Sequence, residues 1–308
     1  MSFKKAVGLV LKLLLTAVIV FFLFRQISHH WQEIKDFDWE ISWLPLIGSI
    51  LVGLATFLIM ASNWQSLIAG FGHRISLLKS FRIFYLSDMG RYIPGKIWPL
   101  MGILYMTKKE GVPPEQATAS FVLIQLFAIP ASFLLFALAV QFEPRILVDQ
   151  VALLGEWSAW LFTACLLIGV VVLVLWPKRL LSLLNVVLRR FSRPEIVFEL
   201  DKKVALQLFV RYSLGWFMYG LAFYLFLEAF APEADIRLIA AVGVFNAAYQ
   251  IGYLALFAPG GFGPRELVMG FMLAPFLGPV APAIAIMARL WAIIVEVTAA
   301  LIALMIRK

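Results

Sequence analysis

Two short segments of the chain combine proline, glycine and basic side chains within long apolar stretches. They are residues 90–96 (GRYIPGK) and residues 259–266 (PGGFGPRE). A helix that is interrupted inside lipid leaves backbone N–H and C=O groups unpaired, and it persists only where protein, water or a ligand supplies partners for them. Both segments therefore predict sites where a polar ligand binds in apolar surroundings.

The second segment has the chemistry of a phosphate site. Its three glycines permit backbone angles and close approaches that side chains would forbid: Gly260, Gly261 and Gly263. Pro264 suits the first turn of a helix, whose N-terminus carries roughly half a positive charge. Arg265 adds a full charge, so we expect the segment to bind an anion such as a phosphate. Glu266 is placed to cap the same helix or to hold a cation in position.

The first segment repeats this pattern. Pro94 and Gly95 are flanked by Arg91 and Lys96, and Asp88 lies one helical turn before Arg91. Two cationic turns from distant parts of the chain can converge on one anion, and broken helices that meet near the middle of the membrane recur in transporters. The alternative is that these residues only turn the chain, with the charges marking the membrane surface.

Two further ionisable residues lie in the last apolar run. Arg289 and Glu296 are seven residues apart, which places them on one face of a helix and two turns apart. An ionisable group in hydrocarbon usually faces a partner or a cavity. We expect partners from other helices, with Glu266 as a candidate for Arg289; a purely structural salt bridge between helices fits the pattern equally well.

The composition sets the fold class. Of the 308 residues, 63% are apolar and 14% are charged, which leaves too little polar surface to cover a soluble globule. The sequence predicts an all-α, polytopic bundle of transmembrane helices in a single integral membrane domain, residues 1–308. The apolar runs lie at residues 6–24, 43–68, 117–142, 157–176, 205–230, 236–258, 264–280 and 283–306.

These runs predict about eight crossings, with broken or re-entrant segments near residues 75–106 and 259–280. Residues 97–106 are apolar but too few for the ~20 residues that a crossing needs, so we expect a re-entrant hairpin there. An interfacial helix pair is the alternative. If the seventh run, which contains Pro275, only dips into the membrane, the number of crossings falls to seven.

The basic residues indicate the orientation, because cytoplasmic loops are enriched in lysine and arginine. Two clusters carry most of them: Arg74, Lys79, Arg82, Arg91, Lys96, Lys108 and Lys109, and then Lys178, Arg179, Arg189, Arg190, Arg193, Lys202 and Lys203. Placing both clusters inside predicts that both termini are cytoplasmic. The formal net charge of +8 is therefore no evidence for nucleic-acid binding.

Together these motifs resemble a flippase-like membrane family that includes the transmembrane domain of lysylphosphatidylglycerol synthases. The resemblance rests on residues 90–96 followed by Gly111-Val112, and on residues 259–263 with Glu266 three residues further on. It implies a helical protein of the bacterial inner membrane that moves the headgroup of a phospholipid or polyprenyl-phosphate lipid. It also implies a shared functional core: Arg91, Pro94, Gly95, Gly260, Gly261, Gly263 and Glu266.

Two departures limit what the resemblance implies. The soluble aminoacyl-transferring domain of the synthases is absent from these residues, so we do not expect synthase activity. Where many relatives carry an acidic and basic cluster, residues 121–130 offer only Gln125.

The leading hypothesis is a lipid translocase that binds an anionic headgroup in a basic cavity within the membrane. The candidate substrate-binding residues are Arg91, Pro94, Gly95, Lys96, Gly260, Gly261, Gly263, Arg265, Glu266, Arg289 and Glu296.

Two rival hypotheses stay open. One is a membrane glycosyltransferase that uses a lipid-linked sugar, since Asp36 and Asp38 could hold a divalent metal. The other is an ion-coupled transporter of small solutes, with Glu266 and Glu296 as proton carriers. No nucleotide-binding or serine-nucleophile motif is present, and we expect no cofactor. The expected partners are membrane lipids, together with a second copy of the chain or a partner glycosyltransferase.

Overall fold

The computed structural model describes residues 28, 31–37, 39–93, 97–147, 157–176, 179, 182, 185, 186, 189, 190 and 201–306. Within this part of the chain the regular structure is helical and no strand occurs. The prediction of an all-α, polytopic helical bundle is confirmed. The first apolar run, residues 6–24, lies outside the described residues, so the total number of crossings stays a prediction.

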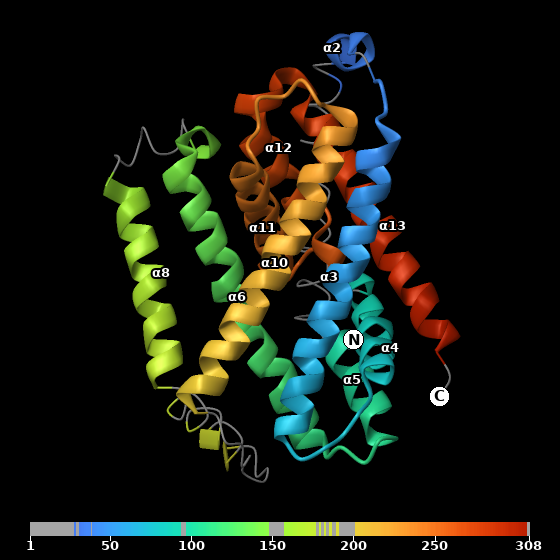
Figure 1. The fold of residues 1–308 in the computed structure, drawn as a ribbon, viewed down its shortest axis with the longest axis vertical. Coiled ribbons are helices and arrows are strands. Elements are labelled where there is room, and N and C mark those ends of the chain that lie inside the picture. The colour runs from blue at the N-terminus through green and yellow to red at the C-terminus, as the bar shows by residue number, and fades with distance from the viewer. Residues whose placement is uncertain are drawn as a thin grey trace, which may run out of the picture.

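The helices follow the apolar runs of the sequence (Figure 1). They are α2 (Trp31–Asp36), α3 (Trp43–Gly70), α4 (Leu77–Asp88), α5 (Trp98–Lys108), α6 (Pro114–Phe142), α8 (Trp157–Leu175), α10 (Lys202–Phe230), α11 (Leu238–Leu254), α12 (Pro264–Leu277) and α13 (Ala281–Met305). Short 3₁₀ turns are η1 (Met89–Tyr92), η2 (Pro144–Leu147), η3 (Pro259–Gly261) and η4 (Gly278–Val280).

Five stretches of the described chain are long and apolar enough to cross a membrane. Four are α3, α6, α8 and α10, and the fifth is the 47-residue stretch Pro259–Met305. This last stretch is not one rod, because Gly278 has a φ of 55° and turns the chain between α12 and α13. The 25 residues of α13 span about 37 Å, enough to cross the ~30 Å hydrocarbon layer alone.

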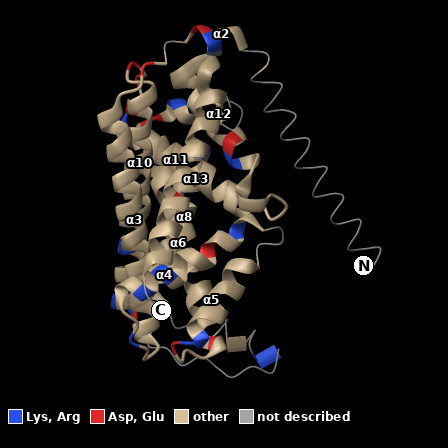
Figure 2. Cartoon of the chain, turned by 90° about the vertical axis from the view of Figure 1, so that its right-hand side faces the viewer, with Lys and Arg blue, Asp and Glu red and all other residues tan. Residues whose placement is uncertain are grey.

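Polar contacts identify the two ends of the bundle. At one end, Lys79 bonds Glu110 at 3.0 Å, which joins the first turn of α4 to the segment after α5. At the other end, Arg145 pairs with Asp235 at 2.9 Å, which joins η2 to the segment before α11. In Figure 2, blue lysines and arginines are concentrated toward the end where α4 begins and α5 ends. Which end faces the cytoplasm remains a prediction from charge.

Two helical hairpins enter the bundle from these opposite ends. One is α4–η1–α5 and the other is α11–η3–α12. Helix α4 has 12 residues and α12 has 14, so they are about 18 and 21 Å long, shorter than the hydrocarbon layer. The sixth and seventh apolar runs of the sequence thus form one hairpin whose arms, α11 and α12, are shorter than a full crossing.

The tips of the two hairpins touch. A Cβ atom added at Gly260 in η3 would lie 2.9 Å from the ring of Tyr92 in η1, so the contact depends on the missing side chain. The same is true inside each hairpin: a Cβ at Gly102 would meet the Ser87 backbone at 2.8 Å, and a Cβ at Gly252 would meet Cβ of Arg265 at 2.8 Å. The two interrupted segments of the sequence are therefore neighbours in space.

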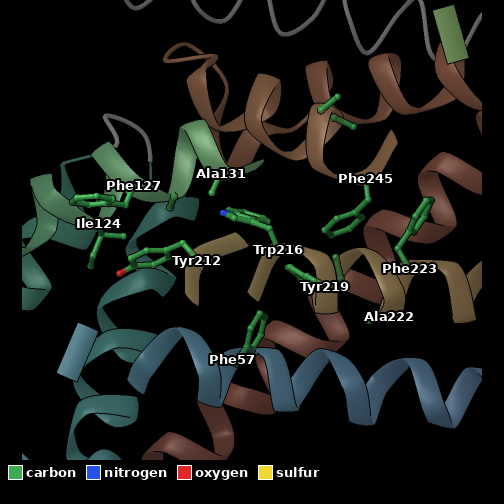
Figure 3. Close-up of a cluster of buried hydrophobic side chains, with 14 of the residues drawn as sticks. Phe57, Ile124, Phe127, Ala131, Tyr212, Trp216, Tyr219, Ala222, Phe223 and Phe245 are labelled. Carbon is green, nitrogen blue, oxygen red and sulfur yellow. The ribbon is translucent and has the colours of Figure 1, made fainter. Parts of the chain in front are cut away.

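Aromatic side chains from α3, α6, α10 and α11 pack together in the core of the bundle (Figure 3). The ring of Tyr219 on α10 packs 4.6 Å from Phe245 on α11 and 5.4 Å from Phe57 on α3, centroid to centroid. Buried polar groups also join the helices, since the indole N–H of Trp291 donates to Ser49 at 3.0 Å. These contacts hold α10, α11 and α13 as a frame for the hairpin tips.

Candidate ligand-binding cavity

Arg91 links the first hairpin to two other helices. Its Nη1 atom donates to the hydroxyl of Tyr249 on α11 at 2.5 Å and lies 3.2 Å from Oε1 of Glu296 on α13. Its Nη2 atom is ion-paired with Asp88, one turn earlier. The hydroxyl of Tyr92 donates to the second oxygen of Glu296. Glu296 as a whole residue is 1% exposed, so this network lies inside the protein.

We call the two interrupted segments the first break, residues 90–96, and the second break, residues 259–266. The glycines of the second break take the backbone angles that their residue type permits. Gly260, Gly261 and Gly263 have φ values of 59°, 76° and 93°, in the left-handed region that favours glycine. Helix α12 begins at Pro264, and Oε2 of Glu266 accepts a hydrogen bond from the Gly263 N–H at 2.6 Å. This is one half of a capping box, because Gly263 has no side chain to complete it.

Arg289 fastens the second break to α13. Its Nη2 atom donates to the carbonyl oxygen of Gly260 at 2.8 Å. Its Nε atom lies 3.4 Å from Oε1 of Glu266, an electrostatic contact in which neither atom makes a hydrogen bond. The pairing of Arg289 with Glu266 proposed from the sequence is therefore present. Glu296, on the same face of α13, faces Arg91 instead.

Arg265 differs from the other two arginines. Its guanidinium lies 4.6 Å from the ring centroid of Tyr249 and 5.1 Å from that of Phe245, and the residue is 4% exposed. Within the described part of the chain it forms no ion pair, and its Nη2 atom has no hydrogen-bond partner. A buried charge that no ion pair compensates is unfavourable. An anion beside Arg265 would remove this cost.

A cavity of about 180 Å³ lies against Arg265 and receives both breaks. It is lined by Phe84, Asp88, Arg91, Pro99, Ile103, Phe121, Gln125, Tyr249, Gly252, Tyr253, Leu254, Leu256, Gly260, Gly261 and Arg265. We call it the first cavity. Leu256 is 69% exposed and Leu254 is 48% exposed, so apolar side chains at the surface of the bundle form part of its wall.

A second cavity of about 100 Å³ adjoins the first. The two share six lining residues: Phe84, Asp88, Arg91, Gln125, Tyr249 and Tyr253. The rest of its wall comes from α3, α4, α6, α10 and α11, including Thr56, Tyr85, Tyr212, Trp216, Tyr219 and Gln250. The two cavities therefore have a common wall at Arg91 and Tyr249.

The described charges around the tips balance. Three arginines and three carboxylates lie around the tips: Arg91, Arg265 and Arg289, and Asp88, Glu266 and Glu296. The sequence predicts a basic cavity, but the structure places a carboxylate beside Arg91 and Arg289. The positive character is concentrated at Arg265, the member of this set without a carboxylate partner.

A family profile described as the lysylphosphatidylglycerol synthase TM region matches residues 9–301. The chain belongs to this family. The resemblance inferred from the two broken segments is thereby confirmed over nearly the whole length. Family membership and the long apolar helices together show a membrane protein. A search among curated proteins gives no match.

The residues predicted for the site of this family member fall into three groups. Arg91, Gly260, Gly261 and Arg265 line the first cavity. Gly263, Glu266, Arg289 and Glu296 stand behind it and hold the tips. Pro94, Gly95 and Lys96 lie outside the described residues.

Asp36, one of the two residues proposed to hold a metal, lies away from the cavity. Asp36 is exposed at the end of α2, which packs against η4 at the end of the bundle opposite to the start of α4. Asp38 is outside the described residues. Among the described residues, no group of three histidine, cysteine or acidic side chains could hold a metal ion.

Sequence reasoning missed the tyrosines of α11. Tyr249 bonds Arg91, stacks on Arg265 and lines both cavities. Tyr253, four residues later, lines both cavities as well. The available signal was the spacing, because Tyr249 and Tyr253 are one turn apart and, with Asn246 and Gln250, are the polar residues of an apolar helix.

Proposed function

We propose that the protein is a lipid translocase that binds the anionic headgroup of a phospholipid or polyprenyl-phosphate lipid between the hairpin tips. One observation carries this proposal: the buried guanidinium of Arg265, which forms no ion pair with a described residue and whose Nη2 atom has no hydrogen-bond partner, lines the cavity that both breaks form. A phosphate fits this position because an arginine offers several N–H donors in one plane. The proposed location is the bacterial inner membrane, with both termini in the cytoplasm.

The wall of the first cavity supports a lipid as the ligand. Leu254 and Leu256 are exposed on the bundle surface and also line the cavity. A headgroup can therefore reach Arg265 from the side while its acyl or prenyl chains stay in the bilayer. A ligand bound in this way never has to take its apolar chains out of lipid, which avoids the main cost of crossing.

The opposed hairpins supply a means of movement. Three contacts hold the tips to one another and to α13: Arg91 to Glu296, Tyr92 to Glu296, and Arg289 to the Gly260 carbonyl. A phosphate beside Arg265 also lies near Arg91, which lines the same cavity, and competes with Glu296 for that cation. Loosening this contact would let one hairpin shift against the other and expose the headgroup to the opposite side.

The test compares Arg265→Gln with wild-type protein in proteoliposomes that contain fluorescent phosphatidylglycerol, with dithionite quenching of the outer leaflet as the readout. We expect the translocation rate to fall by about tenfold or more, equivalent to ~1.4 kcal/mol. Arg211→Gln is the matched control, because Arg211 bonds Ser62 and Ser66 and lines neither cavity. Equal rates in wild type and Arg265→Gln would reject the site.

The glycosyltransferase hypothesis has a separate test. Metal-dependent sugar transfer by the purified protein that disappears in Asp36→Ala would favour an enzyme over a translocase. Asp36 lies at the end of the bundle, so this variant leaves the first cavity intact. Translocation is thus tested at Arg265 and sugar transfer at Asp36, so the two variants distinguish the two functions.

A further inference from the structure

The second cavity has a lining unlike that of the first. Apart from Asp88 and Arg91 on the shared wall, its polar groups are uncharged hydroxyl, amide and indole groups set among aromatic rings. Asp88 and Arg91 are already paired with each other. Nothing in the translocase mechanism at Arg265 requires such a chamber.

Three polar atoms of α10 beside this cavity have no partner. The hydroxyls of Tyr212 and Tyr219 and the indole Nε1 of Trp216 are buried, and none makes a hydrogen bond in the described structure. They are spaced four and three residues apart, so they form one stripe of the helix (Figure 3). A buried donor or acceptor without a partner is unfavourable, so a ligand that supplies one is favoured.

Elsewhere in the same core, similar groups are satisfied. The indole N–H of Trp64 donates to Ser120 at 3.1 Å, and that of Trp291 donates to Ser49 at 3.0 Å. The side chain of Asn246 donates to the Trp216 and Val242 carbonyls and accepts from Ser132. The fold thus supplies partners to several buried polar groups, although Asn63, Ser80 and Ser213 also lack one. The α10 atoms differ from these three because their residues line a cavity.

Two amides extend this set across the cavity. Gln125 lies on α6 and Gln250 on α11, and both line the second cavity. Gln250 is 1% exposed. Within the described residues, no side-chain hydrogen bond of either glutamine is found, although an amide offers two donors and an acceptor. The wall thus presents several uncharged donors and acceptors on more than one side.

Aromatic faces combined with uncharged hydrogen-bonding groups match a hydroxyl-bearing ligand. C–H groups of a polyol or sugar pack on ring faces, and its hydroxyls bond the amides, phenols and indole. An acyl chain would leave those groups unpaired. A cationic group would be repelled by Arg91, and the nearby carboxylate of Asp88 is already paired with that arginine. The volume of about 100 Å³ compares with ~30 Å³ per water in the liquid, so a small polyol or part of a sugar fits.

We propose that the second cavity is a subsite for the uncharged, hydroxyl-bearing part of the headgroup, with the phosphate held at Arg265 in the first. This assignment rests on the proposed translocase function. Tyr249 connects the two sites, because its ring lies under Arg265 and its side chain lines both cavities. One headgroup can then span the common wall and present phosphate on one side and hydroxyls on the other.

The experiment measures binding to the purified full chain in detergent by native mass spectrometry, using lipids with identical acyl chains. Three lipids serve as probes: phosphatidylglycerol, phosphatidylinositol and phosphatidylpropanol, whose headgroup has no hydroxyl. Phosphatidylethanolamine, whose headgroup ends in an ammonium group, is the comparison. We expect a hydroxyl-bearing lipid to bind about tenfold more tightly than phosphatidylpropanol, equivalent to ~1.4 kcal/mol. Preference for glycerol or for inositol then distinguishes a small polyol from a sugar. Equal affinities, or tightest binding of the ethanolamine lipid, would overturn the proposal.

Two variants locate the effect. Tyr219→Phe removes an unsatisfied hydroxyl but keeps the ring, so the fold is expected to tolerate it. Combined with Gln250→Leu, it should bring the affinity ratio close to one. Tyr105→Phe is the matched control, because Tyr105 is 66% exposed on α5 and lines neither cavity. A ratio that survives in the double variant would reject the assignment.

The outcome is separable from that of the translocase assay. A hydroxyl preference without lipid movement would retain the subsite and reject translocation. Lipid movement that depends on Arg265 but ignores the headgroup hydroxyls would reject the subsite alone.

Discussion

The guanidinium of Arg91 lies 3.2 Å from the carboxylate of Glu296, although 205 positions separate the two residues in the chain. The contact joins the tip of one hairpin to a helix that crosses the whole bundle. Both groups are largely buried, with side-chain exposures of 18% and 2%. Buried ion pairs of this kind are costly to break on one side, because the remaining charge keeps its burial without its partner.

Replacing only one member of this pair should destabilise the protein more than replacing both. We expect Glu296→Gln and Arg91→Gln each to lower the thermal midpoint, each equivalent to about 3–5 kcal/mol for a fully buried pair. The double variant should lose less than the sum, with a coupling of about 0.5–3 kcal/mol. Thermal unfolding in detergent, followed by tryptophan fluorescence, measures all three variants. Strictly additive losses would show that the two charges do not interact.

A methyl group at the hairpin tip should separate the two breaks. In Gly260→Ala, the new Cβ would lie 2.9 Å from the Tyr92 ring and 3.0 Å from Nη2 of Arg289, and the φ of 59° adds about 1–2 kcal/mol of backbone strain. We expect a lower thermal midpoint and loss of lipid translocation.

Gly169→Ala is the control for that substitution. Gly169 lies in α8, and a Cβ there would have no atom within 4 Å. Because alanine is the better helix former by about 1 kcal/mol, the control should be neutral or slightly stabilised. Equal behaviour of the two variants would mean that the tip contact at Gly260 is not required.

Acid should weaken the end of the bundle at which α11 begins. Hydrogen bonds from Arg145, and then from Arg237, lower the pKa of the buried Glu143 carboxylate below its usual value of 4.5. A carboxylate whose pKa is lower in the folded state contributes stability that is complete above its unfolded pKa and is lost as the pH falls through the folded pKa. We expect the thermal midpoint of wild type to drop below about pH 4.5.

Glu143→Gln should lower stability at neutral pH and flatten this acid response. Glu40→Gln, an exposed carboxylate at the same end, serves as the control and should retain the wild-type response. Thermal unfolding at several pH values from 3 to 7 checks both. An unchanged acid response in Glu143→Gln would assign the titration to other groups.

Charge alone should not replace the guanidinium of Arg265. Arg265→Lys keeps a cation but loses the flat surface that stacks on Tyr249 and the planar arrangement of donors. We expect a translocation rate between those of wild type and Arg265→Gln. Dithionite assays at two salt concentrations measure it. A lysine variant as fast as wild type would show that only the charge matters at this position.

Much of the site was predictable because local rules determine it. Gly260, Gly261 and Gly263 take left-handed backbone angles, and Glu266 caps α12 from the third position, as their order in the chain indicates. The positions of the interruptions also follow from glycine and proline in apolar sequence. These features depend on residues within one turn of one another.

The choice of partners was harder to predict, because it depends on how helices meet. Arg289 and Glu296 lie on one face of α13, yet one contacts the second hairpin and the other the first. A broken segment near residues 259–280 was expected, but hydropathy did not show where α11 ends, since the sixth apolar run continues to residue 258 whereas α11 ends at Leu254. An apolar run indicates that a segment is buried in hydrocarbon or in protein. It does not indicate how far across the membrane the segment extends. The α10 stripe was missed because aromatic residues at helical spacing usually indicate ordinary core.

The shortness of the hairpin arms has a consequence for biogenesis. Helices α5, α11 and α12 have 11, 17 and 14 residues, fewer than the ~20 that allow a segment to insert on its own as a spanning helix. Their turns carry backbone groups that lipid cannot satisfy. The long helices must therefore be in place before the arms can fold between them. The two turns that line the first cavity are then the last part of the protein to mature after synthesis.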